Sequence, residues 1–168
     1  GLLSADSDDP EAAYNSQDKV FDSAISKALA AADTAYSRAL YREALRHAVY
    51  DLLAARDSYR AMCDTLGVPM KRSLIFRFIE AHAIAMSPIA PHFADYLWRT
   101  VLKREGFIWS NASWPAPKPV DAAILKKSAY IERLLNTCRV AISTYTDPTK
   151  HSKKNKGKDA PPPPAYPT

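Results

Sequence analysis

The spacing of hydrophobic residues along this chain is that of helices and not of strands. Apolar side chains recur every three or four positions, which places them on one face of an α-helix. This spacing predicts helices over residues 18–38, 41–66, 71–86, 91–103 and 121–143. Gly67, followed by Pro69, is typical of a helix end and closes the second of these segments.

The same spacing assigns most large apolar side chains to the interior of a bundle. On the second predicted helix the inward positions are Tyr41, Leu45, Ala48, Leu52, Tyr59, Cys63 and Leu66. On the last predicted helix they are Ile124, Leu125, Ile131, Leu134, Leu135 and Cys138. Both cysteines are expected to be small buried hydrophobes. The aromatic residues expected to pack rather than to stack on bases are Tyr36, Tyr41, Tyr50, Tyr59, Phe76, Phe78, Tyr96 and Trp98.

Prolines divide the chain where the helical spacing stops. Pro88 and Pro91 interrupt it because proline lacks an amide donor and disfavours helix in the preceding residue. Residues 106–119 hold Trp109, Trp114 and three prolines, and we expect them to be irregular. The predicted fold class is all-α: an antiparallel bundle of about five helices, a short irregular Trp/Pro-rich segment and a disordered tail.

Composition and charge limit the size and the partners of the protein. With 168 residues and 47% hydrophobic content, the chain is long enough for one domain with its own core. We expect a loose acidic lead-in over residues 1–17, the bundle over 18–146, and a lysine- and proline-rich tail over 147–168. The sequence has no leader-like start and no membrane-length apolar run, which predicts an intracellular protein with no membrane partner. A net charge of +5 permits a nucleic-acid partner without proving one.

The sequence predicts neither a catalytic site nor a metal site. Its four histidines are scattered, and no serine or cysteine lies near one of them in a nucleophile setting. The two cysteines lack the spacing of zinc ligands. His92, at the start of a helix, is expected to be a packed or capping residue.

Two segments resemble a known family. Residues 86–98, MSPIAPHFADYLW, resemble a run found in the anticodon-binding bundles of class I aminoacyl-tRNA synthetases for leucine, isoleucine, valine and methionine. Residues 111–115, NASWP, resemble a segment of eukaryotic and archaeal leucyl-tRNA synthetases, and the resemblance extends over about residues 18–145. The motif residues expected to have structural roles are Pro88, Pro91, His92, Trp98, Trp114 and Pro115.

The resemblance implies a tRNA-binding helical domain of a cytoplasmic leucyl-tRNA synthetase. Its partners would be leucine-accepting tRNA, held mainly through sugar and phosphate, and the rest of the synthetase. The domain would position the tRNA for ATP-dependent aminoacylation by catalytic domains that this chain does not contain. The parent protein would be a leucine-tRNA ligase, with ATP and magnesium used only in its catalytic domain and no cofactor in this chain.

The second predicted helix carries the main candidates for RNA binding. At about 100° per residue, four of its arginines fall within an arc of roughly 80° beside the apolar stripe. They are Arg42, Arg46, Arg56 and Arg60. Guanidinium groups at this spacing suit phosphate oxygens along an RNA backbone. The alternative is a solvated face on which the arginines pair with Asp57, Asp64 or acidic residues of the next helix.

Four further cations are candidates for the same role. Lys71 and Arg72 open the third predicted helix, where the helix dipole disfavours cations unless a phosphate lies nearby. Lys153 and Lys154 belong to a basic cluster in the tail, which could hold RNA electrostatically. In both places, solvated surface charge is the alternative, and the tail cluster also resembles a nuclear-localisation patch.

A different kind of function stays open at this point. Residues 163–166, Pro-Pro-Ala-Tyr, match the ligand of a WW domain, so the tail could bind other proteins. The chain would then be a helical protein-interaction module for which RNA is incidental. The equivalent bundle of a related class I synthetase is a further alternative, against which the NASWP segment argues.

Overall fold

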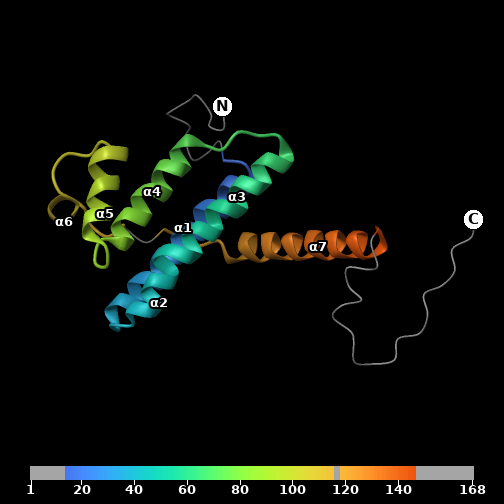
Figure 1. Cartoon of the computed structure of the whole chain (residues 1–168), viewed down its shortest axis with the longest axis horizontal. Helices are drawn as coiled ribbons and strands as arrows, with labels where there is room; N and C mark the ends of the chain where they lie inside the picture. Colours follow the sequence, from blue (N-terminus) through green and yellow to red (C-terminus); the bar gives the residue numbers. More distant parts are fainter. Residues whose placement is uncertain (1–13, 116–117, 147–168) are drawn as a thin grey trace, which may run out of the picture. The chain divides into compact units, whose positions relative to one another are not determined.

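A computed structural model describes residues 14–115 and 118–146, which are largely helical and contain no strand (Figure 1). The predicted all-α fold is confirmed. Contacts divide the chain into two compact units, residues 1–126 and 127–168. Most of the predicted lead-in and the whole predicted tail, including Lys153 and Lys154, lie outside the described residues.

Helix α1, Ser16–Ser37, begins at an asparagine cap. Asn15 Oδ1 accepts the backbone N–H of Asp18 at 2.9 Å, while the N–H of Asn15 donates to Asp18 Oδ2 at 3.0 Å. This reciprocal pair is a capping box, which satisfies two amides at the helix start. Ala39, with a positive φ of 55°, turns the chain into the next helix.

Residues 41–66 form one continuous helical stretch, as predicted, but its middle turn is π-helical. The stretch consists of α2, Tyr41–Leu45, the π-helix η2, Arg46–Asp51, and α3, Leu52–Leu66. Ala44, Ala48 and Leu52 are all buried although they lie four residues apart. Each four-residue step of an α-helix advances the face by about 40°, so the wider π turn brings these residues back toward one side.

Gly67 ends this stretch as the sequence predicts. It adopts a left-handed φ of 66°, and the N–H of Val68 donates to the carbonyl of Cys63 at 3.0 Å. A residue with a side chain would be strained at this φ, which explains the glycine.

A buried carboxylate joins α1, α3 and the start of α4, Arg72–Met86. The hydroxyl of Tyr59 donates to Asp18 Oδ1 at 2.6 Å and accepts the N–H of Lys71 at 3.0 Å. The Tyr59 ring stacks on Phe21, with centroids 4.6 Å apart. Asp18 is only 1% exposed, so each of these polar groups needs the partner that it has.

His82 connects α4 to the π turn. Its Nδ1 lies 3.0 Å from the carbonyl oxygen of Ala48, and its ring stacks on Phe78. Burial lowers the pKa of His82 below its ordinary value, and the charge of Arg56 lowers the pKa further.

A second, smaller core lies under the segment that follows α4. Helix α5, Pro91–Tyr96, continues into the π-helix η3, Leu97–Val101, and α6 spans Ile108–Asn111. Pro91 occupies the first turn of α5, as predicted. The buried residues of this core are Ala83, Ile84, Ala94, Trp98 and Ile108. Trp114 packs against both cores and meets Tyr36 edge-on at 6.0 Å, so it ties the irregular segment to the bundle.

Helix α7, Ala122–Thr146, matches the predicted bounds but buries no residue. The predicted inward positions Ile131, Leu134 and Leu135 are 40–50% exposed, and Cys138 is exposed too. The expectation of a buried Cys138 is therefore wrong, whereas Cys63 is buried as predicted. The helical spacing identified an apolar face but not whether another element covers it.

Several aromatic residues also depart from their predicted packing role. Tyr59, Phe78 and Trp98 are buried, as expected. The exposed aromatic positions are Tyr41, Tyr50, Phe76 and Tyr96, and Leu66 is exposed too. The π turns change the phase of the helical stretches that carry four of these five residues, whereas Phe76 lies on α4, which is α-helical throughout.

The variant Tyr59→Phe tests the buried link. It leaves Asp18 Oδ1 and the Lys71 amide without their partner, so we expect a loss of about 1–3 kcal/mol in the free energy of unfolding. The measurement is urea denaturation followed by circular dichroism. Tyr50→Phe, on an exposed ring, is the matched control and should change stability by less than about 0.5 kcal/mol. Equal effects of the two variants would contradict the account.

The depressed pKa of His82 predicts a loss of stability in mild acid. The unfolded chain takes up a proton near pH 6.5, whereas folded His82 resists protonation, so stability falls as the pH drops below about 6.5. Unfolding free energies at pH 7.5 and 5.5 measure this loss. It should vanish in His82→Gln and persist in His92→Gln, whose parent residue is exposed. Persistence in His82→Gln would assign the pH dependence to other groups.

Candidate nucleic-acid interface

Three of the four candidate arginines form ion pairs with neighbouring acids on their own helix. Arg46 Nη1 lies 3.4 Å from Glu43, Arg56 Nη2 2.7 Å from Asp57, and Arg60 Nε 3.9 Å from Asp64. The pairs with Asp57 and Asp64 are those named above as the alternative to RNA binding, and the pair with Glu43 adds a third. These side chains are 41–60% exposed, and such surface pairs contribute about 1 kcal/mol or less, so a phosphate can compete for them.

The arginines do not form the single stripe that a regular helix predicts. Arg46 lies toward α1, where it lines a groove with Ala24 and Lys27. Arg56 lies toward α4, with its guanidinium carbon 5.9 Å from the centre of the Phe78 ring. The π turn between them rotates α3 relative to α2, which explains the split. The sequence could not supply this rotation, because π turns have no simple sequence signal.

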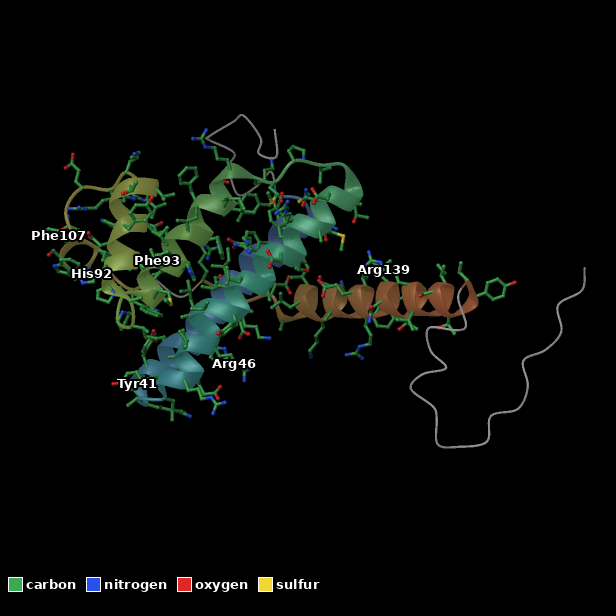
Figure 2. All side chains as sticks on the ribbon, in the orientation of Figure 1. Tyr41, Arg46, His92, Phe93, Phe107 and Arg139 are labelled. Carbon is green, nitrogen blue, oxygen red and sulfur yellow. The ribbon has the colours of Figure 1, made fainter. Side chains whose placement is uncertain are left out.

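The groove beside Arg46 gathers positive charge between α1 and the π turn. Its volume is about 430 Å³, and Lys27 and Arg46 line it together with small side chains of α1. His47 Nδ1 lies 2.7 Å from Asp51 Oδ2 at the same groove. Arg42 is exposed one helical turn before Arg46, which is labelled in Figure 2. Within the described ranges, Arg42 makes no ion pair. Lys27, Arg42 and Arg46 are therefore the cations of the bundle best placed to share one polyanion. Lys27 was missed in the sequence because it was not part of a visible cluster.

Lys71 and Arg72 lie at the start of α4, as predicted, but in a different setting. Lys71 is the N-cap residue, and its amide already donates to Tyr59. This amide is therefore not available to a phosphate. The guanidinium carbon of Arg72 lies 5.3 Å from the centre of the Phe76 ring, a cation–π contact that holds the charge at the surface.

The motif residues fall into a buried and an exposed group. Trp98 is buried, while Trp114 and Pro115 are partly buried. Pro88, Pro91 and His92 are exposed, and Figure 2 shows His92 on the outside of α5. His92 was expected to be packed or capping, but it is exposed, and α5 has no side-chain cap hydrogen bond. The two prolines act through the backbone, by ending α4 and starting α5.

Two further properties concern chemistry and environment. No group of three or more histidine, cysteine or acidic side chains within residues 14–115 and 118–146 is arranged to hold a metal ion. In the same part of the chain, every helix is too short or too polar to cross a membrane.

Comparisons with a family model and with individual known proteins indicate the same family. Residues 18–159 match the family model described as the anticodon-binding domain of tRNA ligase. The cytoplasmic leucine–tRNA ligase of Arabidopsis thaliana is 41% identical over 115 residues, 68% of this chain and 10% of that protein. The yeast Saccharomyces cerevisiae enzyme of the same name is 39% identical over 126 residues, 74% of this chain and 11% of its own. That of Pongo abelii is 31% identical over 139 residues, 83% of this chain and 11% of its own. The chain thus spans about a tenth of the length of these relatives.

Proposed function

We propose that this chain, which belongs to the family of anticodon-binding domains of tRNA ligases, binds leucine tRNA and positions it for aminoacylation by a separate catalytic region. The observation that carries the proposal is the family match over residues 18–159, together with relatives that are named leucine–tRNA ligases. The NASWP segment, noted in the sequence, agrees with the leucine member of the class I group.

The exposed cations support binding through the phosphate backbone. Lys27 and Arg46 line one groove, and Arg42 is exposed one helical turn before Arg46. The exposed ion pair of Arg46 with Glu43 is weak enough to exchange for phosphate. Arginine forks bind phosphate oxygens in a bidentate manner and stay charged at every physiological pH. Such contacts carry little sequence information, so we expect modest specificity of the isolated chain for one tRNA.

The chemical step belongs to the longer protein. The relatives are ligases of about ten times the matched length, and we propose that ATP and magnesium are used in their catalytic region and not in this domain. Their names place them in the cytoplasm, and we propose the same compartment here.

A protein contact is the second candidate function, and α7 favours it. Ile131, Leu134 and Leu135 expose an apolar face that is costly to leave in water. The partner we propose is the remainder of the ligase. This contact is compatible with tRNA binding through the cations of the bundle.

Two double variants test which arginines contact RNA, because the π turn places one pair beside the groove and the other pair away from it. Arg42→Gln/Arg46→Gln removes charge on the groove side, and Arg56→Gln/Arg60→Gln removes equal charge beyond the π turn. We expect the first pair to lower the slope of log K against log[salt] for leucine tRNA by roughly 1.5, since each phosphate contact contributes about 0.7–0.9. The second pair should lower it less.

The control for charge alone is Arg133→Gln/Arg139→Gln on α7, with helicity of every variant checked by circular dichroism. If all three pairs reduce the slope equally, tRNA binding responds to net charge and the groove is not the contact. If the intact chain does not bind tRNA at any salt concentration, the proposed function of the isolated chain is wrong.

A further inference from the structure

Phe107 and Trp109 form a stacked aromatic pair on the surface. Their ring centroids are 4.7 Å apart with planes 8° from parallel, yet Phe107 is 45% and Trp109 is 59% exposed. One face of Trp109 is covered by Phe107, so much of its exposed area comes from the other face and the edges. Figure 2 shows Phe107 at the outer edge of the α5–α6 region, away from α2.

The segment that carries the pair is anchored on both sides. Ile108, between the two rings, is 2% exposed, and its N–H donates to Asp95 Oδ1 at 3.2 Å. Asn111 Nδ2 donates to the carbonyl of Glu105 at 2.9 Å and fills the space that a side chain at Gly106 would need. The rings are therefore held in place before any ligand arrives, which lowers the entropic cost of binding.

One cation, Arg99, lies against the pair. The guanidinium carbon of Arg99 lies 5.1 Å from the centre of the Phe107 ring, and its Nε is 3.3 Å from Asp95 Oδ2. The same Asp95 carboxylate thus orients both Ile108 and Arg99. Lys103 and Arg104 are exposed on the connection that leads to Phe107.

We propose that Phe107 and Trp109 form a stacking platform for an unpaired nucleotide of the bound RNA, with Arg99 and Lys103 near its phosphates. Parallel exposed rings bordered by cations are the arrangement by which proteins bind single-stranded nucleic acid. A protein-docking surface would instead be expected to have a broader apolar area depleted of charge. This inference rests on the proposed function, because it names the contact by which the domain holds an unpaired part of tRNA.

Stacking also fits the modest specificity expected of this domain. Every base has an aromatic face, so a platform holds a nucleotide without reading which base it is. The sequence pattern that corresponds to this pair is Phe-Ile-Trp, in which two aromatic residues flank a buried isoleucine.

The experiment compares Trp109→Ala and Trp109→Phe with the intact 168-residue chain. The probes are leucine tRNA, a twelve-nucleotide single-stranded RNA and a blunt RNA duplex of equal charge. We expect Trp109→Ala to weaken single-strand binding on the order of tenfold, with Trp109→Phe retaining most of it. Duplex binding should not change. Tyr130→Ala, which removes a similarly exposed ring from α7, is the matched control and should bind as the intact chain does.

Tryptophan fluorescence gives a second and direct readout. Stacking of a base on Trp109 should quench emission of the intact chain when single-stranded RNA is added, and Trp109→Phe should lose this quenching. Unchanged binding and equal quenching in the variants, with tRNA binding intact, would overturn the platform and leave the proposed function standing. A Trp109→Ala variant that binds RNA normally but no longer associates with the separately expressed remainder of the ligase would also overturn it, in favour of a protein contact. Absence of tRNA binding by the intact chain would instead contradict the proposed function itself.

Discussion

The carboxylate of Asp18 is the constraint on which the bundle depends. One oxygen closes the capping box of α1, and the other accepts the hydroxyl of Tyr59 on α3. That hydroxyl in turn accepts the first amide at the start of α4. A buried carboxylate that lost one of these donors would carry an uncompensated desolvation cost, so the start of α1, the middle of α3 and the start of α4 are held in one relative arrangement. The stacked rings of Phe21 and Tyr59 lie next to this hydrogen-bond network and belong to the main core.

The π turns decide what this core presents to solvent. By realigning Leu52 with Ala44 and Ala48, the turn in η2 keeps the second helical stretch packed on α1 while it moves Arg56 toward α4. The carbonyl of Ala48 in that turn is met by the ring of His82. The distribution of positive charge on the surface is therefore a consequence of core packing. Arg46 and Lys27 share the groove because the turn lies between Arg46 and Arg56.

Much of this fold could be predicted from local patterns, and the departures have physical causes. Helix bounds, the glycine end at Gly67 and the proline start at Pro91 depend on nearby residues, and they agree with prediction. The π turns depend on packing between helices, so the predicted arginine stripe and the burial of Tyr41 and Leu66 were wrong. For α7, periodicity revealed an apolar face, but it could not show whether another element covers Cys138 and its neighbours. The aromatic pair at Phe107 and Trp109 was missed because it lies in an irregular segment, where no period assigns an orientation.

The central claim is that exposed cations of this bundle hold tRNA by its phosphates. The most direct test is the equilibrium binding of the unmodified chain to leucine tRNA over a series of salt concentrations. The account predicts that log K falls linearly with log[salt], with a slope of several times the roughly 0.7–0.9 expected for one phosphate contact. Binding that does not change with salt would show that counterion release does not drive the association, and it would contradict the account.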